Sequence, residues 1–561
     1  MASLISLRSL APSLPLFFFL FSFADDGRGI YLKHCASCHH EDRIGRTAPP
    51  LLPEFLGKKN DDYLVRVIKE GIPASSMPSF GFLSEKDVKK LIDFIRKPSP
   101  HLIYTLKDIE NSYTKLEGNT KKLGIKDVKN LIVAVDRGSR KVSLIEESRV
   151  LDSFPFGNVH GGVKFSPGGR DFYVPARDGW IAHYSVEEGR LKEKIRACIY
   201  LRNIALSPSG NRLLASCVLP KSLLLMDKNL KPLKKIELEG RPGAVYELNK
   251  SGHFILTFRD KPYVALVNQE GDILYKRIDS PLEDFFIDPL ERFIVGSSRK
   301  EGKLLVYELE SLKKVFEREV PGLPHLFSAS FWYTGGSFYF ATRHIGSTKV
   351  SIWRMYDWEL VKEIDTGGKG FFVRTNSKVP DLWIDNGGGE FILIDKKSLE
   401  VKRFKASEGG QATHVEFSAD GRFAYVSVVG GKRGLYLYDP LSLEPLGKIP
   451  AEYPVGKYNF VNKSRSFDTV QLGYQVFMEK CWGCHHTTKE AFGPPFKWIA
   501  KHRNKAQIVS QMLNPEETAK LLGYDRNAMP KIALSPEEVE VLLSLIESLK
   551  GDEEDKHAKT E

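Results

Sequence analysis

Two short motifs, one near each end of the chain, have the residue types and spacing that can hold a redox cofactor. Both read Cys-x-x-Cys-His, and they are formed by Cys35, Cys38 and His39 and by Cys481, Cys484 and His485. Two thiols spaced in this way on one helical turn can both add to the vinyl groups of a haem, and the adjacent histidine then faces the iron. The motifs therefore predict two covalently attached c-type haems, with His39 and His485 as axial ligands, and electron transfer as the underlying chemistry.

A methionine downstream of each motif can supply the second axial ligand of a class I cytochrome c domain. Met77 lies in Ser-Ser-Met-Pro-Ser-Phe, and Met529 lies in Asn-Ala-Met-Pro-Lys. A thioether sulfur stabilises ferrous iron and raises its potential. Each methionine is followed by an amphipathic helical run, for which Ser84 and Ser535 are the expected N-caps. A Cys-x-x-Cys pair alone also occurs in zinc and redox sites, so the full set of features carries the haem assignment.

The first 24 residues indicate export from the cytoplasm. They contain one arginine, a short apolar stretch and small residues at Ser22 and Ala24, which is typical of a secretory signal peptide cleaved after Ala24. A membrane anchor is the competing interpretation, but the apolar run is shorter than the roughly 20 residues needed to span a bilayer. We expect a periplasmic protein with no membrane span after signal cleavage. In that compartment Cys198 and Cys217 either form a disulfide or remain buried free thiols.

The chain has a formal net charge of +11, which raises the question of nucleic-acid binding. No nucleic-acid-binding motif accompanies this charge, so we expect no nucleic-acid partner. Either the basic residues form a solvated surface, or they attract anionic partners or a carboxylate-rich cofactor.

The middle of the chain is built from a repeat of short strands with Gly and Asp turns. One residue in the first turn of each repeat serves as a marker, and the markers found are Ser166, Ser207, Asn249, Asp288 and Ser418. They recur about every forty residues, and the longer gap before Ser418 has room for three repeat lengths. A period of this length with four strands per unit predicts a β-propeller. A β-sandwich or two smaller barrels would explain the strands but not the steady period. The markers define seven units, and LIVAVDRGSRKVSLIEES supplies an eighth, so we expect eight blades.

These observations predict a multidomain chain. The expected parts are a signal peptide at 1–24, an all-α cytochrome c domain at 25–100, an eight-bladed β-propeller at 101–465, a second all-α cytochrome c domain at 466–550 and a disordered tail at 551–561.

Several strings between residues 27 and 465 resemble the haem d1 proteins, a family that includes cytochrome cd1 nitrite reductases and NirN-type dihydro-haem d1 dehydrogenases. The strings are VHGGVKFSPGGRDFYVPARDGWIAHY, VPGLPHLFSASFW, GKGFFVRTN, THVEFSADGRFAYVS and VGKYNFVNKSRS. The resemblance implies a non-covalent haem d1 or dihydro-haem d1 in the propeller. It also implies that His160 is the iron ligand and that His325 is a distal-side histidine.

The resemblance is closer to the dehydrogenase branch than to the reductase branch. The reductases place two distal histidines over the iron, where they protonate nitrite. Here His325 stands at one of these positions, but Phe371 stands at the other. His414 occupies a position that the dehydrogenases use when they oxidise a propionate side chain to an acrylate. We therefore expect His414 to act as the base, with Tyr458 as an orienting donor; an ordinary buried strand histidine is the alternative for His414.

Arginines in the first three repeats are expected to bind the carboxylates of this cofactor. Arg137, Arg177 and Arg202 recur with the repeat, which favours their convergence on one end of the propeller. The planar guanidinium group pairs with a carboxylate through two parallel hydrogen bonds. Arg374, just after Gly-Lys-Gly-Phe-Phe, is a weaker candidate.

The resemblance implies an oxidoreductase of denitrification that converts dihydro-haem d1 to haem d1 and passes electrons through the c-type haems. The implied partners are an external electron acceptor or donor, such as a small cytochrome or cupredoxin, and haem d1 biogenesis proteins or nitrite reductase. Two alternatives are a cytochrome cd1-type nitrite reductase that forms nitric oxide and a non-catalytic protein that binds haem d1 for electron transfer or delivery. The second cytochrome c domain departs from the usual family pattern, and it either holds the second electron, acts as a fused acceptor or docks partners.

Overall fold

The computed structural model describes residues 26–45, 48–57, 59–71, 77–99, 102–157, 159, 162–299 and 301–550. The predicted signal peptide, the predicted disordered tail and His160 lie outside the described residues. The chain divides into two compact units, Met1–Pro100 and His101–Glu561. Among the described residues, no helix is both long enough and apolar enough to cross a membrane.

The first unit is built from short helices around an apolar core. The helices are α1 (Gly27–His34), α2 (Ala36–His39), α3 (Pro53–Leu56), α4 (Asp61–Glu70) and α5 (Glu85–Ile95). As predicted, Ser84 caps α5, because its side chain accepts a hydrogen bond from the amide of Asp87. Tyr31 of α1 is fully buried and packs on Phe94 of α5, with ring centroids 5.3 Å apart. The Cys-x-x-Cys-His motif begins at Cys35, directly after α1, and continues through α2.

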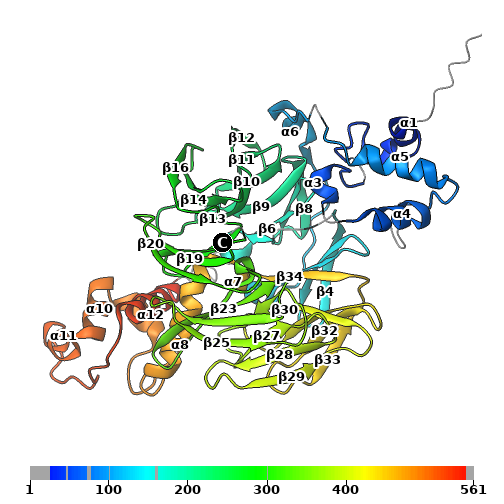
Figure 1. Cartoon of the computed structure of the whole chain (residues 1–561). Helices are drawn as coiled ribbons and strands as arrows, with labels where there is room; N and C mark the ends of the chain where they lie inside the picture. The colour runs from blue at the N-terminus through cyan, green and yellow to red at the C-terminus, as the bar shows by residue number, and fades with distance from the viewer. Residues whose placement is uncertain are drawn as a thin grey trace, which may run out of the picture. The chain divides into compact units, whose positions relative to one another are not determined.

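In the second unit the described residues form eight antiparallel sheets around a common axis, which confirms the predicted eight-bladed β-propeller (Figure 1). From the innermost strand outward, blade 1 consists of β34 (Pro454–Asn459), β2 (Ile132–Asp136), β3 (Lys141–Glu146) and β4 (Arg149–Pro155), and blade 2 consists of β5 (Lys164–Phe165), β6 (Asp171–Pro175), β7 (Trp180–Ser185) and β8 (Arg190–Arg196). Blade 3 consists of β9 (Tyr200–Leu206), β10 (Arg212–Leu219), β11 (Ser222–Asp227) and β12 (Pro232–Glu237). Blade 4 consists of β13 (Pro242–Glu247), β14 (Phe254–Phe258), β15 (Tyr263–Val267) and β16 (Ile273–Arg277).

Blades 5 to 8 follow in the same order, from the innermost strand outward. Blade 5 consists of β17 (Asp284–Ile287), β18 (Phe293–Ser298), β19 (Lys303–Glu308) and β20 (Lys314–Glu319), and blade 6 consists of β21 (Leu323–Pro324), β22 (Ser330–Thr334), β23 (Ser337–Ile345), β24 (Lys349–Arg354) and β25 (Leu360–Asp365). Blade 7 consists of β26 (Val373–Arg374), β27 (Asp381–Asp385), β28 (Glu390–Asp395) and β29 (Val401–Lys405). Blade 8 consists of β30 (Gln411–Phe417), β31 (Ala424–Val429), β32 (Gly434–Tyr438) and β33 (Pro445–Ile449). Helix α6 (Leu106–Ser112) and strand β1 (Thr114–Lys115) precede blade 1, and β1 pairs with β8.

The ring is closed by the C-terminal end of the propeller sequence. Strand β34 pairs with β2, so blade 1 combines its innermost strand from the end of the domain with three strands from its beginning. Blade 6 differs from the others, because its innermost strand is broken into β21 and β22 by a single 3-10 turn, η3 (Leu326–Ser328). His325 lies at this break, and its amide still donates a hydrogen bond to the carbonyl oxygen of Arg343 in β23 at 2.7 Å.

Successive strands of a blade are antiparallel, so the turns of each blade lie alternately at the two ends of the propeller. The turns that join the second to the third strand contain Arg137, Arg177 and Arg259. The turns that join the first to the second strand contain Lys250 and Arg292. We call the first end the arginine end and the second end the helix end.

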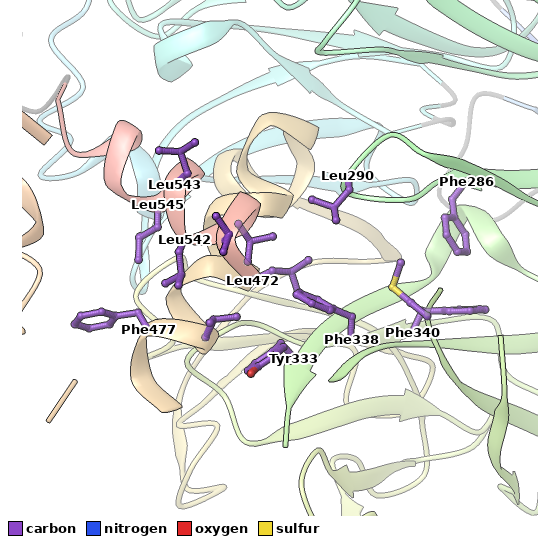
Figure 2. Packing of buried hydrophobic residues seen from close by; sticks show 14 of the residues in the cluster. Phe286, Leu290, Tyr333, Phe338, Phe340, Leu472, Phe477, Leu542, Leu543 and Leu545 are labelled. Atoms are coloured by element: carbon purple, nitrogen blue, oxygen red, sulfur yellow. The ribbon is translucent and has the colours of Figure 1, made fainter. Parts of the chain in front are cut away.

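The C-terminal segment forms further helices, which are α7 (Phe460–Lys463), α8 (Asp468–Lys480), α9 (Phe496–His502), α10 (Lys505–Leu513), α11 (Pro515–Leu521) and α12 (Pro536–Ser548). Of these, α8 and α12 pack against the helix end. A single buried cluster combines Leu290 and Phe338 of the propeller with Leu472 of α8 and Leu542 of α12 (Figure 2). Ser535 caps α12 as predicted, by accepting a hydrogen bond from the amide of Glu538. The C-terminal helices therefore share a hydrophobic core with blades 5 and 6.

Polar contacts around this core connect the same two parts. Arg292, in the first turn of blade 5, donates to Glu537 at 2.5 Å and to Glu540 at 2.9 Å. The hydroxyl of Tyr333 in β22 donates to Glu538, and the side-chain oxygen of Gln475 accepts from the amide of Tyr333 at 2.9 Å. These contacts fix the orientation of α8 and α12 on the propeller.

An Arg292→Glu variant is expected to lower the free energy of unfolding by about 1–3 kcal/mol, because it places a third carboxylate beside Glu537 and Glu540. Thermal unfolding and protease sensitivity of the C-terminal helices measure the effect. Arg299→Glu is the matched control, since Arg299 lies in blade 5 at the arginine end and pairs with Glu283 at 2.8 Å. Equal destabilisation by the two variants would show that the contact with α12 is not important for stability.

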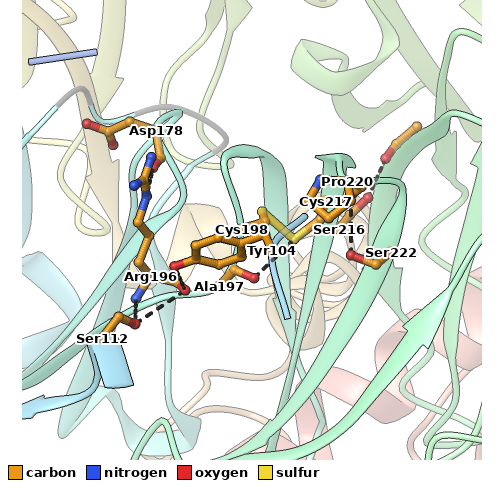
Figure 3. Close-up of a disulfide and its surroundings, with 11 residues drawn as sticks. Tyr104, Ser112, Asp178, Arg196, Ala197, Cys198, Ser216, Cys217, Pro220 and Ser222 are labelled. Atoms are coloured by element: carbon orange, nitrogen blue, oxygen red, sulfur yellow. Dashed lines mark hydrogen bonds between the residues drawn. A yellow bond between two sulfur atoms is a disulfide. The ribbon is translucent and has the colours of Figure 1, made fainter. Parts of the chain in front are cut away.

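A disulfide connects Cys198 with Cys217, which decides the question that the sequence left open (Figure 3). The two Cα atoms are 6.1 Å apart. Cys198 lies just before β9, and Cys217 lies in β10 opposite Leu201. The disulfide therefore ties the start of β9 to its neighbouring strand, close to the position of Arg202.

Candidate functional site

A crevice in the C-terminal helices brings together the residues predicted to hold the second haem. Its volume is about 380 Å³, and Cys481, Cys484, His485 and Met529 all line it. Cys481 follows α8 directly, and Met529 comes from the loop before α12. Most of the exposed lining is apolar, including Ile508, Met512, Leu542 and Ile546. An apolar crevice with two free thiols, an imidazole and a thioether fits a covalently attached haem with histidine and methionine ligands.

The histidines of the two motifs share one hydrogen-bonding arrangement. The Nδ1 atom of His39 lies 2.7 Å from the carbonyl oxygen of Pro49, and that of His485 lies 2.8 Å from the carbonyl oxygen of Pro494. A carbonyl can only accept, so each Nδ1 carries the proton and each Nε2 keeps a lone pair for a metal. Burial lowers the pKa of His39, which favours the same neutral form. Met77 is described and partly buried, but its placement relative to His39 remains a prediction.

At the arginine end of the propeller, five arginines come from different blades. Arg137, Arg177 and Arg259 lie in turns after the second strands of blades 1, 2 and 4, whereas Arg202 and Arg374 lie on the innermost strands of blades 3 and 7. The prediction that Arg202 occupies the same position in its blade as Arg137 and Arg177 was thus wrong, because Arg202 lies in a strand and the other two lie in turns. Its charge nevertheless acts on Arg177 and Arg259, and the three side chains share one region.

Four of these guanidinium groups each have one buried nitrogen that is not hydrogen-bonded within the described part of the chain. The Nε atoms of Arg177, Arg202, Arg259 and Arg374 are buried and have no hydrogen-bond partner among the described residues. Burial, followed by the charges of neighbouring arginines, lowers the pKa of Arg177 despite the opposing effect of Tyr200. Buried charges are normally paired. This arrangement fits an anionic ligand with several carboxylates.

His414 lies on β30, which is the innermost strand of blade 8. Its side chain is only 5% exposed, and its Nδ1 has no hydrogen-bond partner among the described residues. Burial and then the charges of Lys457 and Arg374 hold the pKa of His414 well below its ordinary value. The imidazole is therefore neutral at neutral pH, as a general base must be.

His325 and Phe371 are joined directly across blades 6 and 7. The Nδ1 of His325 lies 2.8 Å from the carbonyl oxygen of Phe371, so this nitrogen donates and Nε2 is left as an acceptor. Phe371 supplies no titratable side chain, and its ring is 47% exposed. Next to it, the ring of Phe372 packs edge-on against His414 at a centroid distance of 4.5 Å.

Tyr458 lies beside His414, but the two side chains do not form a hydrogen bond with each other. Their ring centroids are 6.1 Å apart in an edge-to-face arrangement. Tyr458 and Arg374 line a cavity of about 170 Å³ on the propeller axis, which α8 closes at the helix end through Asp468, Gln471 and Gln475. Burial raises the pKa of Tyr458, so its hydroxyl stays protonated and able to donate. An orienting role for Tyr458 through the present contacts remains a prediction.

His160 lies outside the described residues, but its neighbour can be placed. Val159 forms an isolated bridge with Ala176, and its carbonyl oxygen accepts a hydrogen bond from Arg137 at 3.3 Å. The segment that leads into His160 therefore lies at the arginine end. Its role as an iron ligand remains a prediction.

Sequence reasoning missed Arg259, Lys457 and Asp385. A signal for Arg259 was present, because it directly follows the second strand of its blade, as Arg137 and Arg177 do. Lys457 is fully buried next to His414 in the adjacent strand, and its position follows only from the closure of the ring by β34. Asp385 could not be distinguished in the sequence from the many turn aspartates of the repeat.

Family comparisons match three parts of the chain. Residues 126–463 match the family "Cytochrome D1 heme domain", residues 470–550 match "Cytochrome c", and residues 22–95 match "Cytochrome C oxidase, cbb3-type, subunit III". These families together indicate haem binding. The first match covers the whole propeller, including both the arginine end and β34.

Individual relatives point to the same family. The chain is 33% identical over 468 residues to a dihydro-heme d1 dehydrogenase from Pseudomonas aeruginosa, which covers 78% of this chain and 94% of the relative. It is 22% identical over 375 residues to protein NirF from Stutzerimonas stutzeri, covering 58% and 90% of the two chains. A solved structure of dihydro-heme d1 dehydrogenase NirN in complex with DHE has 32% identity and a TM-score of 0.74, covering 78% of this chain and 99% of that one. The protein therefore belongs to the haem d1 protein family.

Proposed function

We propose that this protein is a dihydro-haem d1 dehydrogenase that binds its substrate at the arginine end of the propeller. The observation that carries the proposal is a neutral buried base, His414, in the same site as arginines whose buried Nε atoms have no hydrogen-bond partner among the described residues. The resemblance to a dehydrogenase over 94% of its length supports the same activity.

In the proposed reaction, a propionate side chain of the substrate becomes an acrylate. Two C–H bonds break and one carbon–carbon double bond forms, and two protons and two electrons leave the substrate. The arginines would bind the carboxylates and orient the tetrapyrrole, and His160 would hold its iron. His414 accepts a proton from the side-chain carbon, and the apolar ring of Phe372 beside it restricts the approach of water.

We further propose that the residues of both Cys-x-x-Cys-His motifs hold covalent haems. Cys35, Cys38 and His39, with Met77, would form the first site in an N-terminal cytochrome c domain. The second site would use the crevice residues Cys481, Cys484, His485 and Met529. Such haems supply one-electron acceptors when bound. The helices of the second site pack rigidly on the propeller, which favours a fused electron acceptor over a freely moving docking module.

The remaining parts of the proposal concern location and partners. A signal peptide at residues 1–24 would direct the protein to the periplasm. There a small cytochrome or cupredoxin would accept the electrons, and a haem d1 biogenesis protein or nitrite reductase would receive the product. The similarity to NirF supports a link with other proteins of this group.

Full-length protein carrying its covalent haems tests the activity when it is mixed with dihydro-haem d1 and an excess of a one-electron acceptor. We expect a product that is lighter by two hydrogen atoms, with two acceptor molecules reduced per product. The absence of this product, combined with nitric oxide formation from nitrite after loading with haem d1, would instead favour a nitrite reductase. If neither product forms but bound haem d1 transfers to another protein, the protein is a carrier.

A truncation that removes residues 471–561 would not isolate the role of the C-terminal haem. It would also expose Leu290 and Phe338 and so disturb the propeller.

A further inference from the structure

Asp385 lies at the end of β27 in blade 7, and its carboxylate binds two separate segments of the site. It is 1% exposed. Oδ1 accepts hydrogen bonds from the amides of Phe371 at 2.7 Å and Phe372 at 2.9 Å. Oδ2 accepts from the hydroxyl of Thr413 and from the amide of His414 at 3.4 Å. One buried carboxylate thus connects the loop before β26 with the innermost strand of blade 8.

The contacts of Oδ1 determine the position of His325. The amide nitrogen of Phe371 is held by Asp385, and the carbonyl oxygen of the same residue accepts the hydrogen bond from His325 Nδ1. Gly370 permits this arrangement, because a Cβ atom there would lie 1.9 Å from the backbone oxygen and 2.3 Å from Oδ1 of Asp385. The loop therefore approaches Asp385 as closely as only glycine allows, and it presents the Phe371 carbonyl to the imidazole.

The contacts of Oδ2 hold His414 in a backbone conformation that non-glycine residues rarely adopt. Its φ angle is +46°, and the strand register shifts between Thr413 and Val415, so His414 forms a β-bulge. Such a conformation is strained and persists only where its surroundings enforce it. Thr413 and His414 themselves donate the hydrogen bonds to Asp385, so these bonds stabilise the β-bulge directly at His414.

We propose that Asp385 is a positioning residue that sets the placement of both site histidines, His325 through Oδ1 and His414 through Oδ2. This inference rests on the proposed function insofar as it concerns turnover. It makes a structural claim as well, namely that each of the two segments depends for its order on one oxygen of this carboxylate. Within the described part of the chain, the carboxylate accepts four hydrogen bonds, all from residues of these two segments, which is why a positioning role is proposed for it rather than a catalytic one.

The first test measures backbone order in the full-length protein by hydrogen–deuterium exchange. An Asp385→Asn side chain keeps one oxygen and turns an amide group toward the remaining donors, so it satisfies one segment but not both. We expect at least tenfold faster exchange in 371–372 or 413–414, or in both. Asp381→Asn is the matched control, because Asp381 is buried in the same strand at its other end. Unchanged exchange in both segments of the Asp385 variant would overturn the proposal, whether or not the protein is a dehydrogenase.

The second test separates positioning from general stability. Thr413→Val removes one donor to Oδ2 and keeps a β-branched side chain suited to the strand. For Asp385→Asn and Thr413→Val we expect kcat for dihydro-haem d1 to fall about 10- to 100-fold, while KM changes much less, because misplacement of a base affects the chemical step more than binding.

The double variant with His414→Ala completes this test. If Asp385 acts through the base, Asp385→Asn should lower the residual turnover of His414→Ala by less than about threefold. A full additional loss in the double variant, or a loss confined to KM, would show that Asp385 is not a positioning residue for His414. If the wild-type protein lacks the activity, the proposed function fails, and the exchange experiment alone decides the role of Asp385.

Discussion

Replacing His414 with alanine is expected to reduce dehydrogenation by about 10²- to 10⁴-fold while the tetrapyrrole remains bound. The reason is that binding and chemistry depend on different side chains. In the proposed site the arginines and His160 would hold the substrate, whereas His414 would accept a proton. An absorption titration with dihydro-haem d1 measures binding, and a single-turnover assay with an excess of acceptor measures the chemical step.

The pH dependence of turnover provides a second measurement on the same residue. Burial, Lys457 and Arg374 lower the pKa of His414, so the imidazole remains neutral as the pH falls through its ordinary value of 6.5. Turnover should therefore stay constant across this range and decline only at lower pH. A histidine with an ordinary pKa would lose half of its activity near pH 6.5.

The control for this variant is His253→Ala. His253 lies in the first turn of blade 4, at the helix end, where its Nδ1 lies 3.2 Å from the carbonyl oxygen of Ser251 in the same turn. The His253→Ala variant should leave both the binding and the turnover of dihydro-haem d1 unchanged. Normal turnover in His414→Ala would remove His414 from the mechanism and make it an ordinary strand histidine.

The double variant Arg177→Gln with Arg202→Gln is expected to weaken binding of dihydro-haem d1 by about two orders of magnitude. Hydrogen bonds between charged groups contribute about 1.5–3 kcal/mol each, and each 1.4 kcal/mol corresponds to a tenfold change in affinity. The two Nε atoms are buried and have no partner among the described residues, so their hydrogen-bonding capacity is free for a ligand. A binding titration of the full-length protein measures the change.

The same variant should not lower, and is expected to raise, the free energy of unfolding of the ligand-free protein. Burial and the charges of Arg137 and Arg202 disfavour the charge of Arg177. Neutral glutamines remove the repulsion. A loss of affinity together with equal or higher stability is typical of residues selected for binding, because structural residues lose both.

Arg403→Gln is the matched control for this pair. Arg403 lies on the outermost strand of blade 7, where it is exposed and pairs with Glu390 at 3.1 Å. It should change neither affinity nor stability measurably. If the Arg177 and Arg202 variant were to bind dihydro-haem d1 normally, the arginine end would not be the carboxylate site.

Local patterns predicted much of this protein correctly. The caps at Ser84 and Ser535 depend on neighbouring residues, and the eight blades follow from a repeat that each unit carries within itself. The Cys-x-x-Cys-His motifs are equally local, because thiols and imidazole must lie on one helical turn. Such features depend on short-range geometry, which a single sequence records directly.

Contacts between blades were decided by the tertiary structure alone. Asp385 joins Phe371 and His414 across two blades, and nothing in its local sequence distinguishes it from the turn aspartates that recur in the repeat. The same reason explains why the docking end of the C-terminal helices could not be predicted, since the repeat gives every blade turns at both ends. By itself the sequence determined the redox motifs, the number of blades and the candidate histidines. Only the closed ring decided which arginines converge, because their distances depend on packing between strands that are far apart in the chain.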